Sequence, residues 1–204
     1  SRPVEWLLDH AGIDARWCVV HATHMTADET RRLAASGAIA GLAPTTEADL
    51  GDGTFAARAY IGARGTFGIG SDSNTIIDPF AELRQLEWSQ RLARQARNVL
   101  ANEGMPVGQT LYAAAARGGA QALARPAGAI APGARADFAV LDADDPALAE
   151  QPAAALLDAA IFGPCRRPVR DVMVAGRWVV RDGHHPQEDA VLGRYRTTLG
   201  RLSR

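Results

Sequence analysis

Short apolar runs that end abruptly in polar residues recur through the N-terminal third of the chain. Such runs cover residues 16–20, 38–42 and 66–69. Each is too short for a free helix, and apolar character on both faces is typical of strands buried in a parallel sheet. The pattern therefore predicts three buried strands.

Helical signals alternate with these runs. A helix is predicted over residues 5–10, before the first strand. Thr26 and Glu29 have the spacing of a capping box, and Gly37 ends the helix that this box begins. Another helix is predicted over 55–63, after a polar loop over 43–53. This alternation predicts right-handed βαβ units and a parallel sheet.

Longer helices are predicted after the third strand. Asp78 is a favoured N-cap and Pro79 a favoured first helical residue. The helix that they begin is predicted to reach at least Leu100. A further helix is predicted over 107–123, although two adjacent glycines, at positions 118 and 119, weaken the expectation that it is continuous.

The pattern changes to alternating apolar and polar residues near position 126. A strand is predicted over 136–142, and a hairpin over 169–174 and 177–180. Alternation of this kind indicates strands with one buried and one wet face. We therefore expect two domains, a parallel α/β domain over 1–125 and a small β lobe with a C-terminal tail over 126–204.

Composition and charge narrow the class of protein. Among 204 residues, 47% are hydrophobic and 22% charged, which is typical of a soluble globular protein. A net charge of −1 gives no electrostatic case for binding nucleic acid or an anionic membrane. We expect a cytoplasmic protein with a small-molecule substrate. Because the chain opens at Ser1 with the end of a helix, we also expect it to be the C-terminal part of a longer protein.

His21 and Asp72 are the candidate catalytic residues. His21 directly follows the first predicted strand, and Asp72 follows the third. The carboxyl ends of parallel strands lie at one edge of a sheet, so the two side chains are expected to share a site. An imidazole and a carboxylate suit a hydrolytic zinc site. The alternative is that His21 is structural and that Asp72 belongs to a simple turn.

Three further residues are candidates for contact with substrate. Thr46 and Glu47 follow the second strand, and Ser73 follows Asp72. Ser73 could also orient the Asp72 carboxylate. The alternative for Thr46 and Glu47 is a solvated loop that caps a helix. His24, three residues after His21, could be a second metal ligand, but a supporting or surface role is favoured.

Taken in order, these motifs resemble a known enzyme family. The segments Val-Val-His-Ala-Thr-His at 19–24, Pro-Thr-Thr-Glu-Ala-Asp-Leu-Gly-Asp-Gly at 44–53 and Gly-Ile-Gly-Ser-Asp-Ser at 68–73 resemble the C-terminal half of metal-dependent amidohydrolases. With the helix over 82–100, the set is most similar to the formimidoylglutamate deiminases of histidine degradation. The resemblance implies strands six to eight of a (β/α)8 TIM-type barrel, and residues 136–138 and 174–177 are similar to the family's β-sandwich lobe.

The resemblance implies a metal site and a reaction. His21 and Asp72 match the family's residues after strands six and eight, which act on a bound metal and its water. Zinc is the implied metal, with iron as a possibility. The implied reaction is hydrolysis of N-formimidoyl-L-glutamate to N-formyl-L-glutamate and ammonia, in which Asp72 takes the proton of the attacking water. A homodimer is expected for the full-length protein.

The family's other metal ligands and its proton-shuttling glutamate do not occur in this chain. Zinc takes three or four protein ligands, and His21 and Asp72 supply at most two. We therefore expect the chain alone to bind zinc weakly and to be inactive. Its open sheet edges also predict aggregation or swapped oligomers.

Two other classes of function stay open. One is another amidohydrolase, such as a guanine- or chlorotriazine-type enzyme. The other is a non-catalytic βα scaffold, which a separation of about 10 Å or more between the His21 and Asp72 side chains would favour, because zinc–ligand bonds are about 2 Å.

Overall fold

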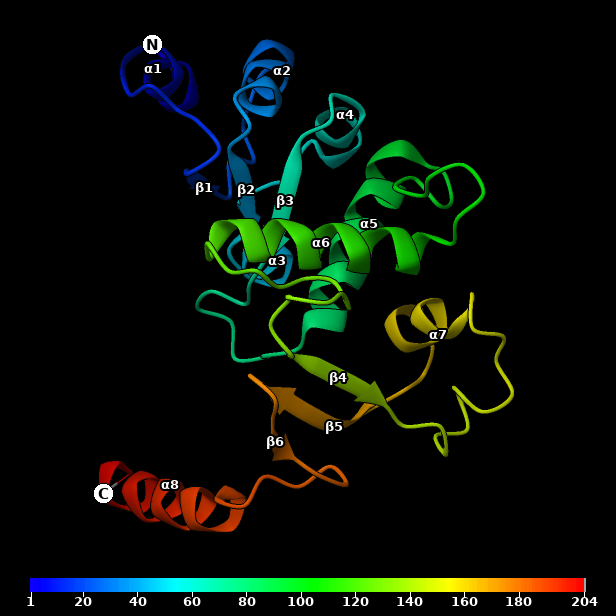
Figure 1. Ribbon diagram of the computed structural model, residues 1–204. Helices are drawn as coiled ribbons and strands as arrows, with labels where there is room; N and C mark the ends of the chain where they lie inside the picture. The colour runs from blue at the N-terminus through cyan, green and yellow to red at the C-terminus, as the bar shows by residue number, and fades with distance from the viewer. Residues whose placement is uncertain (204) are drawn as a thin grey trace.

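Two small sheets organise the protein, whose computed structural model describes residues 1–203 (Figure 1). The first sheet is parallel and has the order β1 (Cys18–Val20), β2 (Ile39–Leu42), β3 (Thr66–Ile69). Val19 lies opposite Ala40, which lies opposite Phe67. The three predicted strands and their parallel arrangement are confirmed. The expectation that all three are buried is wrong for β1, an edge strand in which Cys18 and Val20 are exposed. The other edge is β3.

Helices α1 (Pro3–His10), α2 (Ala27–Ala35) and α4 (Ala57–Gly62) accompany the parallel strands. Helix α2 packs against both α1 and α4. The predicted capping box begins α2: Thr26 Oγ1 accepts a hydrogen bond from the Glu29 backbone N–H, and the Glu29 carboxylate accepts one from the Thr26 N–H. The capping box therefore marks the start of α2, as the sequence predicted.

Residues 44–50 form a helix where a polar loop was predicted. Helix α3 (Pro44–Leu50) begins with Pro44 in its first position and ends at Gly51, whose φ of +71° is left-handed. Its N-cap, Ala43, has no side chain that could cap the helix. The N–H groups of Ala43 and Thr45 instead donate to Glu47 and Glu82.

Helix α5 (Pro79–Arg94) begins as predicted but ends before Leu100. Gln95 adopts a left-handed φ of +51° and ends the helix. The chain then turns back, because the buried Glu87 carboxylate accepts hydrogen bonds from the backbone N–H groups of Val99 and Leu100. Helix α6 (Val107–Ala122) runs without interruption through both glycines and crosses in front of the parallel sheet (Figure 1).

The second sheet is antiparallel. Its order is β4 (Phe138–Leu141), β5 (Val169–Val174), β6 (Arg177–Val180), which confirms the predicted strand and hairpin. The sequence did not predict α7 (Leu156–Phe162), which packs against α5 and α6, because it begins without a capping side chain. Nor did it predict α8 (Glu188–Leu202), which buries none of its residues.

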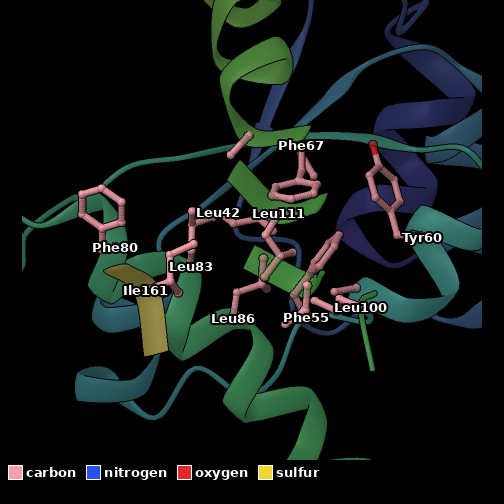
Figure 2. Packing of buried hydrophobic residues seen from close by; sticks show 14 of the residues in the cluster. Leu42, Phe55, Tyr60, Phe67, Phe80, Leu83, Leu86, Leu100, Leu111 and Ile161 are labelled. Atoms are coloured by element: carbon pink, nitrogen blue, oxygen red, sulfur yellow. The ribbon is translucent and has the colours of Figure 1, made fainter. Parts of the chain in front are cut away.

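The core joins the parallel sheet to the long helices (Figure 2). Leu42 and Phe67 from the sheet pack with Leu83 of α5 and Leu111 of α6. Tyr60 of α4 is fully buried, and this burial raises the pKa of its hydroxyl to about 12. Within residues 1–203, no helix has the length and apolar character needed to cross a membrane.

Glu29 gives the fold a testable dependence on pH. Its carboxylate, 4% exposed, accepts hydrogen bonds from the Thr26 N–H at 2.6 Å, the Glu5 N–H at 3.1 Å and Arg2 Nε at 3.0 Å. These bonds, the one from Thr26 foremost, lower the pKa of Glu29 from its ordinary 4.5 to about 2. A lowered pKa stabilises the fold above the unfolded-state value, and the stabilisation is lost as pH falls from about 4.5 through about 2.

The Glu29→Gln variant is expected to lose up to about 3 kcal/mol of unfolding free energy at neutral pH, because one pKa unit corresponds to about 1.4 kcal/mol. The deficit should shrink as pH falls towards 2, since the wild-type carboxyl then becomes neutral. Urea unfolding at pH 7, 4 and 3 measures it. Asp28→Asn, at an exposed neighbour, is the control. A deficit that stays constant over this range would contradict the assignment.

Candidate active site

His21 and Asp72 lie together at the carboxyl ends of β1 and β3. The His21 Nε2 atom is 3.5 Å from Asp72 Oδ2. The His21 side chain is 32% exposed and that of Asp72 46%, so the pair is open to solvent. The separation is far below the roughly 10 Å that would favour a non-catalytic scaffold. The sheet therefore brings together the two residues that the sequence predicted to share a site.

The backbone at both residues is in an unusual conformation. His21 has a φ of +63°, Ala22 of +51° and Asp72 of +50°. These values lie in the left-handed region, which non-glycine residues adopt rarely and at a cost of about 1–3 kcal/mol each. Such conformations persist where the surrounding structure enforces them, and they occur often at functional sites.

Glu47 holds the far side of the His21 ring. Its Oε1 atom is 3.1 Å from His21 Nδ1 and accepts a hydrogen bond from the Ala43 N–H at 3.0 Å. The carboxylate is 5% exposed. A neutral imidazole carries one N–H, and the shorter contact, 3.1 Å to Glu47 against 3.5 Å to Asp72, assigns it to Nδ1. The unprotonated Nε2 then faces Asp72.

Thr46 holds the loop that carries Asp72. Its hydroxyl donates to the Ser71 carbonyl oxygen at 2.6 Å and accepts from the Asn74 N–H at 3.1 Å. Thr46 is 1% exposed. Asp72 lies between these two anchor points, and the adjacent Ser73 is exposed to solvent.

Glu82 was missed in the sequence, where it could be interpreted only as an acidic residue in the first turn of a helix. It is 1% exposed, and its carboxylate accepts hydrogen bonds from both the N–H and the hydroxyl of Thr45. Burial raises the pKa of Glu82 above its ordinary value, and the bonds from Thr45 oppose that rise. Glu82 thus joins α5 to the beginning of α3.

His21 and Asp72 have the ligand atoms that zinc binds, but two side chains are too few for a complete zinc site. Imidazole nitrogen and carboxylate oxygen are donors that zinc takes, usually with three or four protein ligands. Within residues 1–203, no group of three histidine, cysteine or acidic side chains is placed to hold a metal. The His24 ring lies beside Gly53, where an added Cβ would come within 3.3 Å of it. His21 and Asp72 can therefore form only part of a ligand set.

The sequence profile of the amidohydrolase family matches residues 2–179. The chain belongs to this family. It is 50% identical over 202 residues to the formimidoylglutamate deiminase of Pseudomonas aeruginosa, an alignment that covers 98% of this chain and 45% of that protein. The resemblance identified from the motifs is thereby confirmed.

Solved structures of amidohydrolases have the same fold. A crystal structure of an amidohydrolase from Brucella melitensis is similar with a TM-score of 0.93 and 48% identity, over all of this chain and 45% of the other. An adenosine deaminase from Xanthomonas campestris with bound zinc is similar with a TM-score of 0.85 and 26% identity, over all of this chain and 46% of the other. The mixed α/β fold is confirmed, and the chain spans less than half the length of these relatives.

Proposed function

We propose that this amidohydrolase chain is the C-terminal part of a metal-dependent deiminase. The proposed reaction is hydrolysis of N-formimidoyl-L-glutamate to N-formyl-L-glutamate and ammonia. The observation that carries the proposal is the His21–Asp72 pair, 3.5 Å apart, in a chain 50% identical to a formimidoylglutamate deiminase. Catalytic side chains of parallel α/β enzymes occupy this end of the strands.

The proposed architecture follows from the open parallel sheet. We propose that β1, β2 and β3 are strands six to eight of a (β/α)8 barrel whose other strands lie in the remainder of the protein. The proposed domains are 1–125 for the barrel part and 126–204 for the β-sandwich lobe and tail. Support comes from the parallel strand order and from relatives more than twice as long as this chain.

Each residue of the pair has a proposed part in the reaction. Zinc, when bound, supplies a water of lowered pKa. Asp72 accepts the proton of the attacking water at Oδ2. His21 keeps Nε2 unprotonated towards Asp72, because its Nδ1 donates to Glu47. A carbon–oxygen bond forms at the formimidoyl carbon, and the bond to the imino nitrogen breaks. That nitrogen takes up both protons of the water, one of them by way of Asp72, and leaves as ammonia.

Ser73 is the proposed substrate contact of this chain, because it is exposed beside Asp72. The sequence also predicted Thr46 and Glu47 at the substrate. Thr46 Oγ1 and Glu47 Oε1 are already bonded within the protein, and both side chains are buried. We therefore propose that these two residues orient the site.

The chain on its own is expected to bind zinc weakly and to release no ammonia, because His21 and Asp72 are too few ligands. Zinc titration with a competing chromophoric chelator measures the affinity. A tight one-to-one site on the 204-residue chain would contradict this expectation.

The proposed function is tested with a longer protein, produced from the gene read from the next start codon upstream. This protein is called the extended enzyme below. Loaded with zinc, it is expected to release ammonia and N-formyl-L-glutamate from N-formimidoyl-L-glutamate, and a chelator-stripped sample is expected not to. Adenosine, guanine and a chlorotriazine are assayed in parallel. Turnover of one of these in place of N-formimidoyl-L-glutamate would assign the chain to a different amidohydrolase.

A further inference from the structure

We propose that the first turn of α3 is the positioning element of the site. Glu47 fixes the orientation and tautomer of His21, and Thr46 fixes the loop that presents Asp72. The inference rests on the proposed function for its kinetic consequences, but its structural consequences can be measured without substrate. It assigns to Thr46 and Glu47 a role distinct from contact with substrate.

The strained backbone shows why positioning is needed. His21 and Asp72 both hold left-handed φ values, of +63° and +50°. Neither is a glycine, so both conformations are uncommon ones, although aspartate and histidine adopt them more readily than most residues. His21 follows a strand of three residues at the edge of the sheet, with Val20 58% exposed. The sheet holds the His21 N–H, which donates to the Gly41 carbonyl oxygen at 2.9 Å, but this bond does not orient the imidazole ring.

Two adjacent side chains of one helical turn contact His21 and the loop that carries Asp72, a loop that is also closed by a bond from the Asn74 N–H to the Ser71 carbonyl oxygen at 3.0 Å. Glu47 Oε1 lies 3.1 Å from His21 Nδ1. The Thr46 hydroxyl bonds to Ser71 and Asn74, on the two sides of Asp72. Because Thr46 and Glu47 are adjacent on one rigid turn, they set the positions of the two catalytic candidates relative to each other.

The turn is itself anchored to the core. The Glu82 carboxylate holds the N–H and hydroxyl of Thr45, and Glu82 is followed in α5 by Leu83 and Leu86, both fully buried. The Ala43 N–H donates to Glu47 Oε1 and fixes that carboxylate. Helix α3 thus connects the core helix α5 to the segments after β1 and β3. Groups that orient metal ligands in this way typically change metal affinity or activity by about 10–100-fold when removed.

The Thr46→Val variant tests the restraint on Asp72, because valine keeps the shape of threonine and lacks the hydroxyl. In the extended enzyme we expect zinc affinity and kcat to fall by about 10–100-fold while KM changes little. Thr46→Ser keeps an oxygen in place and is expected to restore most of both. A rise in KM with kcat unchanged would assign Thr46 to substrate and overturn the proposal.

Thr30→Val is the matched control for that test. Thr30 is also 1% exposed, and its hydroxyl also donates to a backbone carbonyl, that of Thr26 in α2. We expect this variant to keep kcat and zinc affinity. If Thr30→Val lost both to the same extent as Thr46→Val, the effect would be a general one of buried hydroxyl loss, and the proposal would be wrong.

The tautomer of His21 gives a measurement that needs neither metal nor substrate. In the metal-free extended enzyme, imidazole 15N shifts, assigned with a His21→Asn variant, are expected to show the proton on Nδ1. Glu47→Gln keeps an acceptor and should preserve this tautomer, whereas Glu47→Met removes the acceptor and should give a mixture. Retention of the Nδ1–H tautomer in a folded Glu47→Met protein would overturn the proposal.

These outcomes separate the inference from the proposed function. If no ammonia is released from N-formimidoyl-L-glutamate but the tautomer depends on Glu47 and zinc affinity on Thr46, the substrate is wrong and the positioning role stands. If ammonia is released and neither variant has an effect, the function stands and the positioning role is wrong.

Discussion

Replacing Asp72 with asparagine is expected to lower kcat of the extended enzyme by about 10²–10⁴-fold, the usual contribution of a positioned acid or base. Asparagine has nearly the shape of aspartate and can still accept a hydrogen bond, but it cannot take up a proton at neutral pH. The loss should therefore fall on kcat more than on KM. Steady-state ammonia release from N-formimidoyl-L-glutamate measures both constants.

Asp142→Asn is the control for this variant. Asp142 also follows a strand, β4, but it belongs to the antiparallel sheet and accepts a hydrogen bond from the Asp144 N–H. We expect its kcat to match the wild type. Equal activity of Asp72→Asn and wild type at the same zinc occupancy would remove Asp72 from the reaction and would leave its left-handed backbone without a catalytic reason.

Much of the fold is encoded locally and could be predicted for that reason. The three parallel strands were recognised from short apolar runs, and the starts of α2 and α5 from caps within the same few residues. His21 and Asp72 were found by the same reasoning, since a residue just past a parallel strand must lie at one edge of the sheet.

Other features depend on residues far apart in the chain. Helix α3 has no capping side chain at Ala43 and is held by Glu82, which is 37 positions from Thr45. Glu87 ends α5 early by binding Val99 and Leu100, 12 and 13 positions away. No local pattern contains these pairings. Residues 43–53 were therefore predicted to be a loop, and Thr46 and Glu47 to contact substrate.

Gly118 shows how tertiary packing reverses the meaning of a local signal. A glycine pair within a helix suggests an interruption, yet α6 is continuous there. A Cβ at position 118 would lie 1.9 Å from the Phe67 carbonyl oxygen and 2.5 Å from its carbon. Gly118 therefore allows α6 to contact the backbone of β3, the strand that leads to Asp72.

Gly118→Ala is accordingly expected to destabilise the fold by about 3 kcal/mol, at the upper end of the usual cost of overpacking, because strand backbone cannot move aside as a side chain can. For a chain of this size, that corresponds to a fall in Tm of about 6–12 °C. Thermal unfolding followed by circular dichroism measures the change in Tm.

Gly119→Ala is the matched control. A Cβ at position 119 meets nothing within 4 Å, so the higher helix propensity of alanine should stabilise the protein by about 0.5–1 kcal/mol. A loss of stability for Gly118→Ala and a gain for Gly119→Ala would show that contact with β3, rather than helix propensity, requires glycine at position 118. A gain in stability for both variants would show that α6 does not approach the strand so closely.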